Sequence, residues 1–265
     1  MLALGSALAL QGFALLTFAL LARQLDATQL GAWALWLTLA TIADMTRQGF
    51  VQNGLVKFTA EAAADLPRWL TAAFVLNAAA ALGLGCLLAV VGVVAAPLFS
   101  APELATLAAW GGLVFLLQSL LRFGEAMQIA RQDFRGILLA NVLNGGVQFV
   151  LVALSFWKNL PLNLNQLLVF QAVAITIALF ATIVFFKKQG WVLWQETPFR
   201  KFETFGKVAP PQDNFTFGKW DAACFRQLWR FGRHSAGTNF FSLLFQRLDL
   251  LLIGAFLPPA SVAVY

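Results

Sequence analysis

Charged residues are scarce in this sequence. Asp, Glu, Lys and Arg make up 11% of its 265 residues, whereas 60% are hydrophobic. Soluble domains hold about 25% charged and about 45 to 50% apolar residues. Several stretches carry no charge over a membrane-spanning length, so their solvent must be lipid. The composition therefore predicts an all-α integral membrane protein and excludes a soluble enzyme.

Residues that bind metals or catalyse reactions are also rare. The sequence has two cysteines, Cys86 in an apolar stretch and Cys224 in a polar one, and one histidine, His234. This spacing supports neither a disulfide framework nor a zinc site, so we expect no metal site. No GxSxG, HExxH or Walker-type motif is present, and we expect no cofactor. A membrane-bound enzyme is an alternative for which the sequence offers no catalytic constellation.

The chain is basic, with a net charge of +6 and a pI near 9.8. A basic protein can bind nucleic acid through a compact patch of Lys and Arg. Here the basic residues lie between apolar stretches and form no such patch. They are typical of residues that fix the orientation of helices in a membrane. We therefore expect contacts with membrane lipids and none with nucleic acid.

Seven stretches are long and apolar enough to cross a bilayer. A hydrocarbon core of about 30 Å needs about 20 helical residues at a rise of 1.5 Å each. The mixed segment from Asn53 to Arg68 is predicted to be an interfacial connector. The predicted spans are Leu2 to Ala22, Leu30 to Phe50, Trp69 to Val94, Leu104 to Leu121, Gly136 to Trp157, Gln166 to Phe186 and Phe231 to Leu257.

The positions of Lys and Arg predict the orientation of these spans, since short loops rich in them stay in the cytoplasm. With a cytoplasmic N-terminus, 15 of the 18 basic residues fall in cytoplasmic segments. Arg23 and Lys158 lie outside, and Arg247 lies in the last span. Residues 187–230 are predicted to form a basic cytoplasmic linker, partly an amphipathic helix on anionic lipid. Binding of a regulatory partner is the alternative for this linker.

A weak internal repeat divides the chain. One constant shift along the sequence aligns Gly5-Ser6 with Gly237-Thr238, Leu21-Ala22 with Ile253-Gly254, and Trp33 with Tyr265. Transporter folds are often built from duplicated halves. The repeat predicts a six-helix bundle over residues 1–186, the linker 187–230, and the first helix of an incomplete second bundle over 231–265. We therefore expect the sequence to be a fragment or a truncated form of a longer transporter.

Three short segments carry a resemblance to a known family. Leu21 to Leu25, followed by Gly31-Ala32-Trp33, resembles the pattern after the first helix of the polysaccharide flippases in the MOP exporter superfamily. Leu248 to Gly254 resembles the "LD-x-LLIG" signature in their seventh helix. Glu125 to Phe134 is similar to a basic segment at the end of their fourth helix. These flippases are the O-antigen and exopolysaccharide translocases, related to MATE exporters and to the lipid II flippase.

The resemblance implies a fold and a function. The family has two pseudosymmetric bundles around a central cavity, and the chain would hold the six-helix N-terminal bundle of such a MOP/MATE-like transporter. The family moves a lipid-linked oligosaccharide across the bacterial inner membrane for polysaccharide or lipopolysaccharide biosynthesis, without covalent chemistry. We expect this substrate, membrane lipids and a coupling ion as partners. The alternatives are a MATE-like exporter of drugs or small molecules, a membrane-bound enzyme of polysaccharide biosynthesis, and an inactive truncated fragment.

Charges inside the spans are the candidate site residues. An ionisable side chain in hydrocarbon costs about 2.5 to 3.5 kcal/mol on insertion scales, so each needs a partner or a water-filled cavity. Asp44 and Arg47 lie on one face of the second helix and can pair. Either this pair neutralises itself, or Arg47 faces the cavity and binds a pyrophosphate or an acidic sugar. Arg122 and Glu125 repeat the spacing at the end of the fourth helix, where both can also reach the headgroups.

The remaining candidates lie in the fifth and seventh helices. Arg247 and Asp249 point to different faces and are predicted either to line the cavity or to pack helices. Arg230 and Arg233 precede the seventh helix and are predicted to form an electrostatic entrance or to anchor the topology. A polar stripe on the fifth helix predicts hydrogen bonds between helices, with sugar contacts as the alternative. The stripe consists of Asn141, Asn144 and Gln148.

Overall fold

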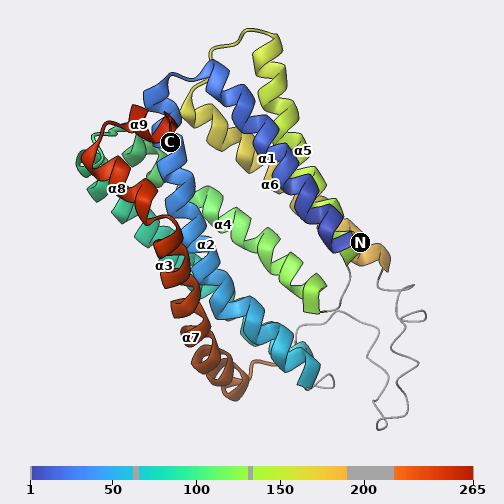
Figure 1. Cartoon of the computed structure of the whole chain (residues 1–265). Coiled ribbons are helices and arrows are strands. Elements are labelled where there is room, and N and C mark those ends of the chain that lie inside the picture. Colours follow the sequence, from blue (N-terminus) through green and yellow to red (C-terminus); the bar gives the residue numbers. More distant parts are fainter. Residues whose placement is uncertain (1, 62–65, 131–133, 190–217, 265) are drawn as a thin grey trace.

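The computed structural model describes residues 2–61, 66–130, 134–189 and 218–264, and every regular element within these ranges is a helix. Figure 1 shows their arrangement. The helices are α1 (Leu2–Gln24), α2 (Ala27–Glu61), α3 (Leu66–Leu98), α4 (Glu103–Ala130), α5 (Phe134–Trp157), α6 (Leu164–Gln189), α7 (Ala222–Gln246), α8 (Leu248–Phe256) and α9 (Pro259–Val264).

The helices confirm an all-α integral membrane protein. In α1, α3, α4, α5 and α6, apolar segments are long enough to cross a membrane, and α7 with α8 makes a sixth span if this bent pair counts as one. Large apolar side chains cover the outside of the bundle, including Leu15, Val94 and Phe180. Such a surface is stable only against lipid. The predicted span from Leu30 to Phe50 lies in α2, which is not among these helices. Polar side chains of α2 are bonded to neighbouring helices instead.

Two predicted boundaries are wrong because helices continue through polar sequence. The predicted connector from Asn53 to Arg68 is helical as far as Glu61, and from Leu66 onward it belongs to α3. This part of α2 packs on α7, where the Lys57 ammonium lies 4.9 Å from the centre of the Phe231 ring. Similarly, α4 continues beyond the predicted end at Leu121, as far as Ala130. Packing against a neighbouring helix therefore outweighs the local drop in hydropathy.

The predicted span from Phe231 to Leu257 begins earlier than predicted and is not one continuous helix. The helix α7 begins at Ala222, where the Asp221 carboxylate caps it by accepting the Ala223 N–H at 2.8 Å. It ends at Gln246, and α8 continues at an angle of 55° after Arg247. The backbone of Arg247 has φ −116° and ψ 6°, outside the helical region. The last predicted span is therefore a broken helix.

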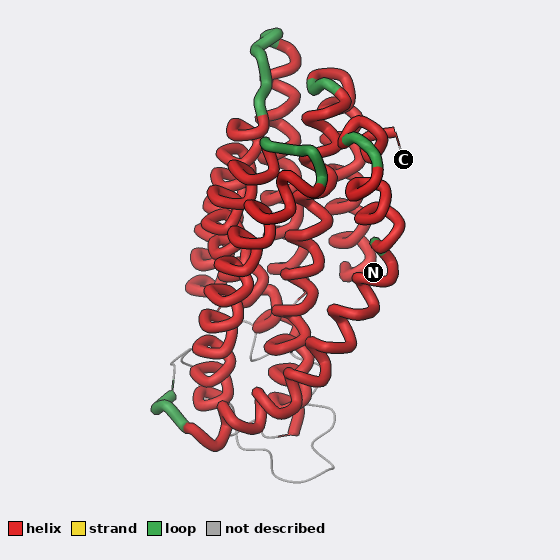
Figure 2. Tube along the Cα trace, turned by 90° about the vertical axis from the view of Figure 1, so that its left-hand side faces the viewer, coloured by secondary structure: helices red, strands yellow, loops and turns green. Residues whose placement is uncertain are grey.

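The bundle has two groups of helices, which Figure 1 separates. One group consists of α1, α5 and α6, and the other of α2, α3 and α7, while α4 packs against both α3 and α6. The long helix α2 contacts α3, α4, α7 and α9. The side view in Figure 2 shows that the helices run along one long axis, as a membrane-spanning bundle requires.

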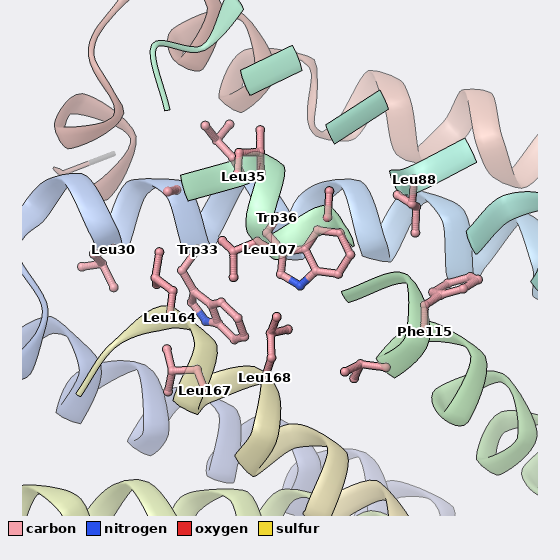
Figure 3. Close-up of a cluster of buried hydrophobic side chains, with 14 of the residues drawn as sticks. Leu30, Trp33, Leu35, Trp36, Leu88, Leu107, Phe115, Leu164, Leu167 and Leu168 are labelled. Carbon is pink, nitrogen blue, oxygen red and sulfur yellow. The ribbon is translucent and has the colours of Figure 1, made fainter. Parts of the chain in front are cut away.

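Two tryptophans of α2 join these groups. Trp33 and Trp36 are each 2% exposed, and they lie in the largest cluster of buried apolar side chains. In Figure 3, Trp33 lies beside Leu164 and Leu168 of α6, whereas Trp36 lies beside Leu107 of α4. Burying such large rings contributes strongly to packing. This core fixes the end of the bundle at which α1 leads into α2.

The helices α2 and α7 approach closely at glycines. A Cβ atom on Gly49 would lie 2.6 Å from the Cα of Ala236, and one on Gly232 would lie 2.4 Å from the carbonyl oxygen of Phe50. Only glycine permits these backbones to come so near. Hydrogen bonds fix the pair, from Asn53 Nδ2 to Ser235 Oγ at 2.6 Å and from Asn239 Nδ2 to the Met45 carbonyl at 3.0 Å.

Candidate functional site

Arg47 lies at the centre of a buried polar network between α2, α3 and α4. Arg47 is 1% exposed. Its Nε and Nη2 donate to Oδ1 of Asp44 at 3.0 and 2.8 Å, and its Nη1 donates to Oδ1 of Asn77 at 2.5 Å. Asn77 in turn donates to the Ser119 carbonyl of α4 at 3.4 Å. Gln48 donates to the second oxygen of Asp44 at 2.8 Å.

A second ion pair lies on α4 beside this network. Arg122 Nη1 donates to Oε2 of Glu125 at 2.6 Å. Arg122 Nε lies 3.9 Å from Oδ2 of Asp44, which links the second pair to the first. The two pairs that share an i, i+3 spacing in the sequence therefore form one charge cluster of Asp44, Arg47, Arg122 and Glu125. Its two positive and two negative charges balance, as burial between apolar helices requires.

The two arginines of the charge cluster differ in what they can still bind. Arg47 has its donors aimed at Asp44 and Asn77, and almost none of its surface is accessible. The Arg122 side chain is 22% exposed, and its Nε has no hydrogen-bond acceptor among the described residues. A guanidinium carries five N–H donors. Arg122 is therefore the arginine with unused donor capacity.

The charge cluster lies inside the bundle, away from the helix ends. Toward the end of the bundle at which α7 begins, α2 continues from Arg47 to Glu61, and α4 continues from Arg122 to Ala130. At the helical rise per residue, these extensions are about 21 Å and about 12 Å long. Arg122 and Glu125 are thus not at the end of their helix, where the sequence-based interpretation places them.

The polar stripe of α5 lies in a helix that packs on α1, α6 and α4. Asn141 and Asn144 are buried, Gln148 is half-buried, and the neighbouring Gly145 lies against the Phe13 ring. The side-chain oxygens of both asparagines are buried without a donor from any described residue. These amides therefore retain the capacity to bind a hydroxyl group or water. No hydrogen bond within the described ranges joins them to the charge cluster.

The candidates of the last predicted span lie apart from the charge cluster, on other helices. Arg247 stands at the break between α7 and α8, and Asp249 in the first turn of α8 accepts the Leu250 N–H at 2.8 Å. Both side chains are exposed. Arg230 and Arg233 are exposed residues of α7, not residues preceding it, because that helix begins at Ala222.

Asn77 is not among the predicted site residues, although a polar residue inside a span is expected to bond to another helix. This residue is 0% exposed and connects Arg47 with α4. The sequence does indicate that Asn77 bonds to another helix, since it is the sole amide side chain in the sequence of α3. A lone amide in an apolar helix is expected to bond to a neighbouring helix. Its partner lies on a different helix, α2, and could not be read from the sequence.

Clusters typical of a metal centre are absent from the part of the chain that the structure describes. Within those ranges, no three His, Cys, Asp or Glu side chains come together as ligands. What the bundle holds instead is a balanced charge cluster among membrane-spanning helices. That combination is typical of transport proteins, in which intramembrane charges mark substrate or ion pathways.

Fold and charge cluster together define a multi-pass helical membrane protein of the transporter class. Comparison with protein families then identifies the family. The family described as "polysaccharide biosynthesis protein" has a model that matches residues 2–265, so the chain belongs to this family. It is the polysaccharide flippase family of the MOP superfamily, a family of membrane transporters and not an enzyme class, which confirms the resemblance seen in the sequence. Comparison with curated proteins and with solved structures found no match.

Proposed function

We propose that the protein moves a lipid-linked oligosaccharide from the cytoplasmic to the outer leaflet of the bacterial inner membrane. The family is one of polysaccharide biosynthesis and transport, and the substrate class is the step that we add to it. The observation that supports it best is Arg122, whose side chain is 22% exposed and whose buried Nε has no acceptor among the described residues of the membrane-spanning bundle. A phosphate or pyrophosphate between lipid and sugar is the anion that a planar guanidinium binds well.

Each candidate residue has a role in this proposal. Arg122 binds the phosphate, and Asp44 orients Arg122 from a distance of 3.9 Å. Arg47 holds Asp44 in position and is a positioning residue in this conformation, because its Nε, Nη1 and Nη2 each donate to Asp44 or Asn77 and the residue is 1% exposed. The α5 stripe, with Asn144 and Gln148, offers polar groups to sugar hydroxyls. The exposed Arg247 and Asp249 complete the set of predicted substrate contacts, and the exposed Arg230 and Arg233 form the predicted electrostatic entrance.

The proposal includes an orientation with the N-terminus in the cytoplasm. Arg23 and Lys158 lie at the end where α1 leads into α2 and α5 into α6, at the top of Figure 1. The start of α7, with Arg226 and Arg230, lies at the opposite end. The richer basic end belongs in the cytoplasm by the positive-inside rule. Substrate then reaches the charge cluster from the cytoplasmic side.

Transport by purified protein in proteoliposomes tests the proposal. A fluorescent lipid-linked oligosaccharide is incorporated, and its arrival in the outer leaflet is followed by a membrane-impermeant quencher. We expect transport by the wild type, strong loss in Arg122→Gln, and normal transport in Arg23→Gln as a matched control at the other end of the bundle. Extrusion of a cationic dye without movement of the oligosaccharide would identify a MATE-like exporter instead, and chemical turnover of the lipid-linked sugar would identify an enzyme.

A further inference from the structure

The helix α7 has two faces of different chemistry. Its buried residues recur at every fourth position, and they pack on α2, as Leu228 does against Gly54. The buried residues are Cys224, Leu228, Gly232 and Ala236. Three exposed arginines follow each other at i, i+4 and i+7, a spacing that places them on one side of the helix, away from this buried face. We call them the arginine stripe, which consists of Arg226, Arg230 and Arg233.

Exposed aromatic residues accompany the arginine stripe. Trp220 is 52% exposed and Trp229 is 44% exposed. Tryptophan is enriched where a membrane meets water, because its ring is apolar and its N–H is polar. Beyond the stripe no charged residue follows before Arg247, and the exposed side chains include Phe241 and Phe245. The exposed side of α7 thus changes from cationic to apolar along the helix, as expected where a helix passes from the headgroup layer into hydrocarbon.

The arginine stripe has no acidic partner among the described residues. The sequence of α7 contains neither Asp nor Glu, and Asp221 before it is the cap that accepts the Ala223 N–H. The ion pairs within the described ranges lie elsewhere, in the charge cluster. Arg233 uses one N–H group internally, since its Nε donates to Nε2 of His234 at 3.4 Å. A guanidinium carries five N–H donors, so most donors of the stripe are available to an anion.

We propose that the arginine stripe binds the phosphate groups of anionic phospholipids in the headgroup layer at the end of the bundle where α7 begins. A phosphate accepts two parallel hydrogen bonds from a planar guanidinium, and clustered basic residues at a membrane surface attract anionic lipids. Trp220 and Trp229 lie beside the headgroups, and Phe241 and Phe245 contact the acyl chains. The site lies outside the charge cluster, and lipid binding at it requires no transport.

The direction in which the arginine stripe faces favours a lipid of the surrounding membrane over the transported lipid. The charge cluster lies between α2, α3 and α4. The helix α7 turns its buried face toward α2, so the stripe faces away from the cluster. Attraction of an anionic substrate from a distance depends on the field of these charges, whereas direct contact depends on their orientation. Direct contact is therefore with the membrane around the protein.

Native mass spectrometry of the full chain in detergent micelles tests this proposal. The protein is titrated with phosphatidylglycerol, which is anionic, or with phosphatidylcholine of the same acyl chains, which is zwitterionic. We expect the wild type to prefer phosphatidylglycerol. Arg226→Gln/Arg230→Gln should weaken that binding by about fivefold per arginine, or about 25-fold in all, and leave phosphatidylcholine binding unchanged. The matched control is Arg23→Gln/Lys158→Gln, which also removes two exposed basic residues, at the other end of the bundle, and should have a much smaller effect.

Three results would overturn the proposal. The first is unchanged binding of phosphatidylglycerol in Arg226→Gln/Arg230→Gln. The second is an equal loss in the control, because binding would then follow net charge alone. The third is binding of farnesyl pyrophosphate that depends on the stripe, without any preference for phosphatidylglycerol, which would assign the stripe to the transported lipid. Micelles impose no topology, so residues that only anchor the orientation of the protein would not produce the preference.

A second variant keeps the test valid if the glutamine variant fails to fold. Arg226→Lys/Arg230→Lys retains both charges but lacks the planar group that bonds a phosphate through two parallel N–H donors. We expect it to bind phosphatidylglycerol more weakly than the wild type and more tightly than the glutamine variant. Affinity equal to that of the wild type would contradict recognition of the phosphate by the guanidinium groups.

Discussion

Replacing Arg47 by Met tests whether this arginine holds α2, α3 and α4 together. The change removes the two N–H donors to Asp44 and the one to Asn77 while keeping most of the side-chain volume. Removing one partner of a buried ion pair costs about 3 to 5 kcal/mol. Asp44 keeps the Gln48 donor, and its side chain is 18% exposed, so we expect the lower end of the range, about 3 kcal/mol.

A double-variant cycle separates the ion pair from simple loss of packing. Asp44→Asn alone leaves the charge of Arg47 buried without its counterion, and it should destabilise the protein by a similar amount. The double variant Arg47→Met/Asp44→Asn contains neither charge of this pair. We therefore expect it to lose less stability than either single variant, which is the sign of a strongly coupled pair.

Unfolding by SDS in mixed micelles, followed by the fluorescence of the nine tryptophans, measures these differences. The control is Arg230→Met, which removes an exposed arginine of α7 and should leave stability almost unchanged. A loss in Arg47→Met no larger than in this control would refute the structural role, as would a double variant that loses the sum of the single effects. If Arg47 contacts substrate instead, as the sequence alone allows, Arg47→Ala lowers export without lowering the abundance of the protein in the membrane.

Three further predictions follow from the helix packing and the orientation. Gly232→Ala places a Cβ 2.4 Å from the Phe50 carbonyl and should cost about 1 to 3 kcal/mol in the same unfolding assay, whereas Gly237→Ala, which meets open space, should be neutral. The Ala223 N–H lowers the pKa of Asp221 below its usual 3.8. This cap therefore stabilises α7 above that pH and loses its effect as pH falls through the lowered pKa. The thermal stability of Asp221→Ala should be lower than that of the wild type at pH 6 and should match it at sufficiently low pH. The orientation is tested with single cysteines in a protein that lacks Cys86 and Cys224. An impermeant maleimide added outside intact cells should label the cysteines at the outside positions and leave the one at the inside position unlabelled. The reverse pattern would overturn the orientation. The outside positions are Thr28, Ser100 and Leu160, and the inside position is Gln227.

The sequence predicts the order of the membrane helices better than their number or their ends, because seven spans are predicted and five helices, or six with the bent pair α7 and α8, are long and apolar enough to cross a membrane. Hydropathy identifies the spans because a run of apolar side chains requires lipid around it. It fails beyond Phe50 and Leu121, where α2 and α4 continue through polar residues. Those residues remain helical because they pack on other helices, as Gly54 does against Leu228 of α7. Tertiary contacts of this kind leave no periodic signal in a window of the sequence.

The candidate site shows the same division between local and long-range information. Both i, i+3 pairs, Asp44 with Arg47 and Arg122 with Glu125, are visible in the sequence because their spacing places each pair on one helix face. Their union into one cluster depends on the packing of α2 on α4. The break at Arg247 leaves no signal either, since neither Gly nor Pro lies beside it, and these residues cause most sharp kinks.

The internal repeat shows which feature of the last helices, the break at Arg247, has no counterpart in α1. The shift that defines the repeat carries Gln24, the last residue of α1, onto Phe256, the last residue of α8, and it carries the start of α2 at Ala27 onto the start of α9 at Pro259. The same shift carries Leu15, in the uninterrupted part of α1, onto Arg247 at the break. The two segments thus end at equivalent residues and differ at the break, where one of them has a charge. Because transporters bind substrates and ions at the broken ends of discontinuous helices, this difference favours Arg247 and Asp249 as substrate contacts even though they lie outside the charge cluster.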